Sequence, residues 1–195
     1  MSQFEIKLGT DLTMKQKEES IDLVVNGFKS LLSFTKSEDK LQTLITKALN
    51  FSLVYVCLDE ERVVGILGIG TNKKRLFRFN EAQCKNLFGK FRGKVILKQL
   101  SDIFTKPCVK GDKDLYIDFL TTSASMRRKG IASMLLEFAC LIPDYETAYI
   151  EVLSKNLNAK RLYEKLGFSV DKKYYYSFIR MQGHGYPIKL IKDIK

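Results

Sequence analysis

Residues 114–168 read DLYIDFLTTSASMRRKGIASMLLEFACLIPDYETAYIEVLSKNLNAKRLYEKLGF, and this stretch decides the fold. Its hydrophobic pattern predicts a strand in DLYIDFLTTSASM, a basic glycine turn in RRKGIA, a helix in SMLLEFACL, a strand in AYIEVL and a helix in NLNAKRLYEKLGF. Strands that alternate with helices are typical of an α/β domain. The stretch therefore predicts an α/β fold.

The glycine turn between the first strand and the first helix of this stretch carries Arg127, Gly130 and Ala132. Backbone N–H groups at a helix start have no partner within the helix and lie at its positive dipole end, so they can bind a pyrophosphate. A small residue at position 130 lets the backbone approach the phosphate closely. The turn is therefore a candidate phosphate site.

Composition indicates one soluble domain that spans residues 1–195. The chain is 45% hydrophobic and 28% charged, which is ordinary for a globular protein. Its cysteines form no CxxC pair, and there is one histidine, so we expect neither a metal site nor a disulfide framework. The first 20 residues lack the apolar core of a secretion signal, and no apolar run reaches membrane-spanning length. We therefore expect a cytoplasmic protein without membrane segments.

Positive charge is concentrated in residues 72–113, where twelve Lys and Arg face three Asp and Glu. This difference of nine makes up most of the net charge of +11. A basic patch of this kind can attract nucleic acid, an acidic membrane, an anionic substrate or the phosphates of a cofactor, and it can also be an ordinary solvated face. The charge alone does not show which of these partners, if any, the segment binds.

The remaining elements follow from hydrophobic spacing and from turn residues. The apolar positions of the basic segment, which we expect to form one buried helix face, are Phe88, Phe91, Val95, Leu100, Ile103 and Phe104. In chain order we expect a strand in FEIKLG (4–9), a helix from Asp11 to about Leu32, a helix capped by Ser37 and ending near Leu49, and a hairpin over 52–71 with a turn at Asp59–Glu61. A mostly helical segment from Lys73 to Cys108, broken at Gly89 and Gly93, would follow, and final strands would run from Phe168 through YYYSFIRMQ.

Two motifs together resemble those of the GNAT superfamily of acyl-CoA-dependent N-acyltransferases. The first is Arg127-x-x-Gly130-x-Ala132, which is similar to the acyl-CoA loop of the family, R/Q-x-x-G-x-G/A. The second begins at Asn156 and includes Ala159 and the run LYEKLGF that ends at Phe168. A lone glycine turn would be weak support, but both motifs occur in the family's order and spacing.

The resemblance implies a GNAT-like central mixed β-sheet of about six or seven strands flanked by helices, with residues 72–113 as a basic helical insertion between strands 3 and 4. The strands 114–122 and 148–153 would run parallel and splay apart, and acetyl-CoA would lie in the gap between them. No metal is implied. The residues that would bind acetyl-CoA are Leu120, Thr121, Thr122, Arg127, Arg128, Lys129, Gly130, Ile131, Ala132, Ser133, Asn156, Ala159 and Tyr163.

Tyr163 is the first candidate for the acid that protonates the leaving thiolate, because the family places a tyrosine here and a phenol has a proton to give at neutral pH. A Tyr or Phe that only packs the helix on the sheet would fit the same position. Asn156 is likewise open to two interpretations, since Asn caps helices well and could equally bond the pantetheine arm of the cofactor.

Two carboxylates compete for the role of general base. Alternation along the first strand places Tyr116, Asp118, Leu120 and Thr122 on one face, which family members use for a catalytic acidic residue. Glu151 lies on the next strand, where similar N-terminal acetyltransferases place a base. We favour Glu151 for proton transfer and Asp118 for shaping the acceptor pocket, and either could instead be a structural carboxylate.

The sequence thus favours an enzyme that transfers acetyl from acetyl-CoA to a primary amine of a small molecule or peptide by direct attack. No acyl-enzyme is expected, since no Cys or Ser lies near a His in the sequence. The insertion would act as a lid that selects the amine, residues 174–176 would line the acceptor cleft, and His184 would lie in a surface turn. A homodimer is possible.

The alternatives are a non-catalytic acyl-CoA sensor and a basic nucleic-acid-binding module. Nucleic acid is the less favoured partner, because Phe77, Phe79, Phe88 and Phe91 have the spacing of a helix core rather than of an exposed stacking platform. A nucleotide hydrolase of the P-loop type is disfavoured, since no GxxxxGK[ST] occurs.

Overall fold

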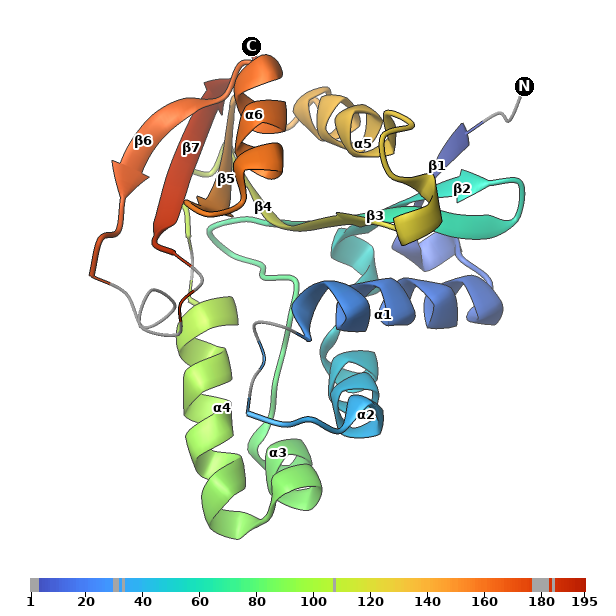
Figure 1. Ribbon diagram of the computed structural model, residues 1–195, viewed down its shortest axis with the longest axis vertical. Helices are drawn as coiled ribbons and strands as arrows, with labels where there is room; N and C mark the ends of the chain where they lie inside the picture. Colours follow the sequence, from blue (N-terminus) through green and yellow to red (C-terminus); the bar gives the residue numbers. More distant parts are fainter. Residues whose placement is uncertain (1–3, 30–31, 33, 107, 177–182, 184) are drawn as a thin grey trace.

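The computed structural model describes residues 4–29, 32, 34–106, 108–176, 183 and 185–195. A seven-stranded sheet in the order β1-β2-β3-β4-β5-β7-β6 forms the centre (Figure 1). β4 and β5 pair in parallel, and the other neighbouring pairs are antiparallel. The mixed α/β sheet confirms the fold expected from the sequence. The strands are β1 (Phe4–Leu8), β2 (Val54–Asp59), β3 (Arg62–Gly70), β4 (Asp114–Thr122), β5 (Thr147–Leu153), β6 (Ser169–Lys173) and β7 (Pro187–Asp193).

Helices cover both faces of the sheet. α5 and α6 lie on one face, and α1 and α2 lie on the other, with α3 and α4 extending away beyond them (Figure 1). Glycines allow the close approach: a Cβ on Gly65 of β3 would lie 2.5 Å from Ile131 of α5, and one on Gly27 of α1 would lie 2.7 Å from Phe119 of β4. The helices are α1 (Met14–Phe28), α2 (Glu38–Ala48), α3 (Glu81–Phe88), α4 (Lys90–Phe104), α5 (Ile131–Cys140) and α6 (Leu157–Lys165).

Side-chain caps fix where the first two helices begin. Thr13 and Gln16 form a reciprocal capping box, so α1 starts at Met14 rather than at Asp11. Ser37 accepts a hydrogen bond from the Lys40 amide at 3.3 Å, which confirms it as the cap of α2. The expected hairpin is also confirmed, since β2 and β3 are joined at Glu60 and Glu61, with Glu60 at φ +57°.

The insertion, residues 72–113, is helical in its centre and not throughout. The expected mostly helical segment is confirmed by α3 and α4, although its first helix begins only at Glu81. Gly89 separates α3 from α4 at φ +86°, as expected. Gly93 does not break the helix, because it lies inside α4 where a Cβ would be 2.5 Å from the Cys84 carbonyl oxygen. This glycine lets α3 and α4 pack closely.

The expected single apolar face of α4 is partly wrong. Leu100 and Phe104 are buried, together with Ile96, but Phe91 is 84% exposed and Val95 is 58% exposed. Among the described residues, α4 is buried along the side that carries Ile96, Leu100 and Phe104, and apolar residues elsewhere on the helix are exposed. Of the phenylalanines expected in a helix core and not on a stacking platform for bases, Phe77 is buried but Phe91 is exposed.

The C-terminal strands differ from those expected. β6 ends at Lys173, and residues 174–176 are not part of a strand, while 177–182 and His184 lie outside the described residues. A further strand, β7, was not predicted and runs between β5 and β6. Ile188 and Leu190 are buried on one side of β7, but the lysines of PIKLIKDIK obscure the apolar alternation in the sequence.

Candidate active site

β4 and β5 part in the middle of the sheet. They are paired from Asp114 with Thr147 to Ile117 with Ile150. Beyond that point β4 continues to Thr122 on β3, and β5 continues to Leu153 on β7. The parallel strands and their separation confirm the prediction. Main-chain N–H and C=O groups along both strands face the resulting gap, where a ligand can bond them.

The glycine turn lies at the start of α5, beside β4. Gly130 takes a left-handed conformation (φ +84°) and Arg128 takes another (φ +63°), so the chain turns sharply into the helix. The start of α5 has no side-chain cap, which leaves the amides of Ile131, Ala132 and Ser133 without a helix partner. A Cβ on Gly130 would meet nothing within 4 Å, so there is open space beside this glycine at the start of the helix. Unpartnered amides at a helix start are the kind of group that binds an anion.

The side chains around this turn suit binding through backbone and charge. Arg127, Arg128 and Lys129 are exposed, whereas the Ile131 side chain is buried in the core. Leu120, Thr121 and Thr122 are half-buried at the end of β4, next to the gap. Any contact from Ile131 to a ligand must therefore come from its main chain.

Helix α6 begins beyond the end of β5 with Asn156. The Oδ1 atom of Asn156 accepts a hydrogen bond from the Ala159 amide at 3.2 Å, so Asn156 caps the helix. Tyr163 is buried, and its ring centroid lies 6.3 Å from that of Phe168. Burial raises the pKa of Tyr163 to about 12. The hydroxyl therefore holds its proton at neutral pH, and the ring also packs α6 on the sheet.

A β-bulge in β4 changes which side chains share a face. Gly68 pairs with Phe119 and the next residue of β3, Ile69, pairs with Ile117, so Asp118 is an extra residue in β4. Tyr116 and Asp118 both contact Arg75 on the insertion face of the sheet. Thr122 is opposite Gly65, on the α5 face.

The prediction that strict alternation keeps Tyr116, Asp118, Leu120 and Thr122 on one face is therefore wrong. The extra residue shifts the alternation by one position, and Leu120 and Thr122 end on the side of α5. Tyr116 and Asp118 thus lie on the insertion face of the sheet, and Leu120 and Thr122 lie on the opposite face.

Asp118 forms a buried ion pair with Arg75, a residue that the sequence did not single out. The guanidinium donates from Nη2 to Oδ1 at 2.6 Å and from Nε to Oδ2 at 3.2 Å. The two side chains are only 7% and 3% exposed. The Leu76 amide adds a bond to Oδ2 at 3.4 Å, and Gly70 leaves room for the carboxylate. Both oxygens of Asp118 are therefore occupied.

Burial and pairing act against each other in this ion pair. Burial raises the pKa of Asp118, and Arg75 opposes that rise. Burial also acts to lower the pKa of Arg75, but the hydrogen bond and charge of Asp118 outweigh it and raise that pKa. No sequence signal marks Arg75, which is one of several basic residues before Leu76.

Glu151 is the second carboxylate near the point where the strands part. Its side chain is exposed on β5, directly opposite Lys189 of β7. Among the described residues it has no ion-pair partner within 4.0 Å. Partial removal from water raises the pKa of Glu151, while Lys189 and then Arg75 act to lower it. Within the described part of the chain, the Glu151 carboxylate thus has no ion-pair partner, and Glu151 is the first residue of β5 beyond the paired stretch.

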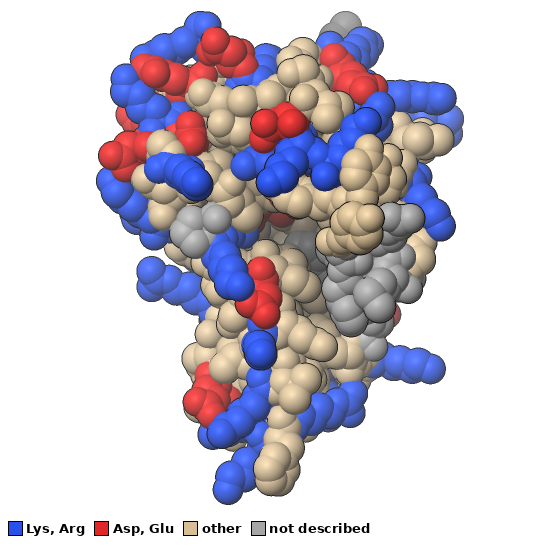
Figure 2. All heavy atoms as spheres, turned by 90° about the vertical axis from the view of Figure 1, so that its left-hand side faces the viewer, with Lys and Arg blue, Asp and Glu red and all other residues tan. Residues whose placement is uncertain are grey.

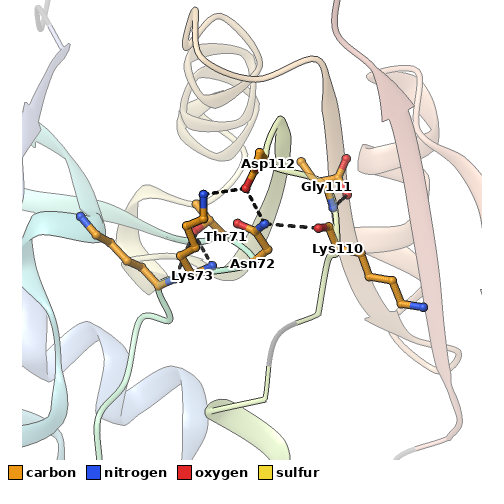
Figure 3. A network of polar contacts seen from close by, with 8 residues as sticks. Thr71, Asn72, Lys73, Lys110, Gly111 and Asp112 are labelled. Carbon is orange, nitrogen blue, oxygen red and sulfur yellow. Dashed lines mark hydrogen bonds and ion pairs between the residues drawn. The ribbon is translucent and has the colours of Figure 1, made fainter.

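The two ends of the insertion are joined close to the sheet (Figure 3). Lys73 forms an ion pair with Asp112 at 2.7 Å, and Asn72 donates to the same carboxylate at 2.8 Å and to the Lys110 carbonyl at 3.2 Å. Thr71 accepts bonds from the amides of the two lysines that follow Asn72. The insertion therefore leaves and rejoins the sheet at one place.

The side of the molecule that carries α4 and β6 is hollowed between the sheet above and the α4 region below (Figure 2). Lys and Arg side chains project from both parts of this side. Within the described part of the chain, no three His, Cys, Asp or Glu side chains gather to hold a metal ion. Over the same residues, no helix is both long and apolar enough to cross a membrane.

Comparison with known proteins shows the same fold in other proteins. Three solved structures cover nearly the whole chain. An N-acetyltransferase from Staphylococcus aureus Mu50 is 17% identical, with a TM-score of 0.64, and covers 96% of this chain and 100% of its own. Ard1 from Thermoplasma volcanium is 14% identical, with a TM-score of 0.58 and 98% of each chain covered. The NatC complex bound to Gag peptide and CoA contains a chain that is 18% identical, with a TM-score of 0.57 and 99% of each chain covered.

At 14–18% identity, these three structures show that the fold is shared and do not by themselves show a shared function. A search of curated proteins found no match. The profile of the acetyltransferase (GNAT) family matches residues 25–168, which include the glycine turn, both parted strands and Tyr163. The chain belongs to the GNAT acetyltransferase family.

Proposed function

We propose that the protein transfers an acetyl group from acetyl-CoA to a primary amine of a small molecule or peptide. The observation that supports this most strongly is the parting of β4 and β5 beside the uncapped start of α5. The gap offers main-chain groups to a thioester arm, and the helix start offers amides to a pyrophosphate. One ligand can use both only if it has a phosphate end and an extended arm, as acetyl-CoA has.

The residues of the glycine turn would hold the phosphates of acetyl-CoA. The amides of Ile131, Ala132 and Ser133 would donate to the pyrophosphate, and Gly130 would keep the approach open. The exposed side chains of Arg127, Arg128 and Lys129 would add positive charge. Main-chain groups of Leu120, Thr121 and Thr122 would bond the arm, while Asn156 and Ala159 would border it at the start of α6.

Glu151 would accept the proton of the acceptor amine, directly or through water. An amine attacks only in its neutral form, so the site needs a group that takes up a proton. Glu151 has free oxygens, whereas both oxygens of Asp118 are bonded to Arg75 and Leu76. In this proposal Asp118 shapes the acceptor side of the gap by holding Arg75 against β4.

The chemical step would be direct. The amine nitrogen forms a bond to the thioester carbonyl carbon, the carbon–sulfur bond breaks, and its electron pair leaves with sulfur. The proton of the amine goes to Glu151, and Tyr163 gives a proton to the leaving thiolate. Fixing amine and thioester in line would supply much of the acceleration. The insertion would lie over the acceptor side and select the amine.

A thiol-release assay tests this function. Acetyl-CoA is mixed with the protein and with separate panels of amino acids, monoamines, polyamines, aminoglycosides and peptide N-termini. We expect release of coenzyme A and a mass increase of the acceptor with at least one amine class. The Glu151→Gln variant should lose most of this rate while still binding acetyl-CoA. Binding of acetyl-CoA without transfer to any panel would instead favour a sensor and contradict the proposal.

A further inference from the structure

Lys189 lies directly opposite Glu151 on the neighbouring antiparallel strand. Facing residues of such a pair have Cβ atoms about 4.5–5.5 Å apart, so opposite charges there usually attract one another. A Glu and a Lys in this register would ordinarily form an ion pair. The structure shows no such pair between them within 4.0 Å.

The ammonium group of Lys189 is bound elsewhere. Its Nζ donates to the carbonyl oxygen of Cys108 at 2.8 Å. It also lies 4.4 Å from the ring centroid of Tyr149, a cation–π distance. Cys108 belongs to the insertion, close to where it rejoins the sheet at Asp114. The insertion and the Tyr149 ring therefore hold the cation next to Glu151 without pairing it.

We propose that Lys189 is a positioning residue for acetyl transfer: the Cys108 carbonyl and the Tyr149 ring keep its ammonium out of an ion pair with Glu151, which leaves that carboxylate free to take the proton of the acceptor amine. This inference rests on the proposed function. It makes the insertion part of the proton-transfer site, because the last segment of the insertion decides where the Lys189 charge lies.

The other charged or titratable groups near Glu151 do not supply a second unpaired cation. Arg75 is held by Asp118 through two bonds, so its charge is fixed and largely compensated. Tyr116, Tyr174 and the Cys108 thiol also interact with Glu151, and burial raises the pKa of each, so none contributes charge near neutral pH. Lys189 is therefore the cation near Glu151, among the described residues, that has no carboxylate partner.

Two substitutions should move the acidity of Glu151 in opposite directions. Lys189→Met removes the nearby cation, so the pKa of Glu151 should rise and the lower limb of the kcat/KM profile should move up by about one pH unit. Tyr149→Leu removes the ring that helps to hold the ammonium, so Lys189 should approach Glu151. The lower limb should then move down, and the maximal rate should fall.

Matched variants separate positioning from a general structural effect. Lys189→Arg keeps the charge and should leave the limb in place. Lys192→Met removes a cation from the same strand, where the ammonium lies 5.9 Å from the Phe168 ring, and should also leave the limb in place. Melting curves of all four variants check that each is folded at the assay temperature.

Direct titration of the Glu151 carboxyl by NMR gives a second readout that needs no acceptor. An upward shift in Lys189→Met, with none in Lys192→Met, supports the inference. Equal Glu151 titration curves in wild type and Lys189→Met overturn it, even if the wild type transfers acetyl groups. A failure of the proposed function is seen separately, as absence of thiol release by the wild type.

Discussion

The two sides of the gap between β4 and β5 are built in different ways. On the α5 side, the site consists of main-chain amides that one glycine turn presents, and the turn is continuous in sequence. On the insertion side, it consists of side chains from separate segments: Arg75, Tyr116 and Asp118, Glu151, and Lys189. A backbone site depends on one short motif, whereas a side-chain site depends on the whole fold.

This difference has a functional meaning within the proposed reaction. Acetyl-CoA is the same molecule in every such reaction, and main-chain amides can bind its phosphates whatever side chains surround them. The acceptor must be recognised and deprotonated by particular groups. We therefore expect changes on the α5 side to affect cofactor binding, and changes on the insertion side to affect stability, pH dependence and acceptor choice.

The largest effect is expected on the α5 side, from Gly130→Glu. The new carboxylate would occupy the open space before the amides and repel phosphate, and a side chain at φ +84° adds backbone strain. Acetyl-CoA should no longer raise the melting temperature. Gly89→Glu is a matched control, because Gly89 has φ +86° with open space around it but lies between α3 and α4. Equal protection of both variants by acetyl-CoA would refute the phosphate assignment.

The next effect is expected on the insertion side, from Asp118→Ala. This change leaves the Arg75 charge buried without its partner, so the free energy of unfolding should fall by about 3–5 kcal/mol. Urea unfolding measures the loss. Asp112→Ala, which breaks the exposed pair with Lys73, should change stability little. If the two variants lost equal stability, the buried pair would contribute no more to the fold than the exposed one.

A smaller effect is expected from Tyr163→Phe, which removes only a hydroxyl. The ring would still pack against Phe168, so folding and acetyl-CoA affinity should be nearly unchanged. Loss of the proton donor should lower turnover about 100-fold. Tyr145→Phe removes the same group just before β5 and should leave turnover as it is. Full activity of Tyr163→Phe would leave the residue with a packing role only.

The sequence predicted the α5 side well, because its signals are local. Gly130 marks the turn, the pattern of apolar residues marks the strands, and the order of the motifs indicates how they are joined. The parted strands follow from that arrangement. The roles of Tyr163, Glu151 and Asn156 remain predictions, and the capping bond of Asn156 shows that one side chain can serve a structural purpose at a predicted site.

The insertion side was predicted poorly for identifiable physical reasons. One extra residue at Asp118 reverses the alternation of β4, and no sequence pattern signals that bulge. Arg75 is one basic residue among many until its burial is known. Lys189 and its strand were missed because lysines interrupt the apolar pattern of β7. In the structure these side chains extend to partners on other segments: Lys189 reaches the Cys108 carbonyl, and Lys192 lies over the Phe168 ring.

A crystal structure with coenzyme A tests the central claim most directly. The account predicts a pyrophosphate bonded to the amides of Ile131, Ala132 and Ser133, and a pantetheine arm that runs between β4 and β5 toward Glu151. Coenzyme A bound elsewhere, with those amides bonded to other parts of the protein, would contradict it.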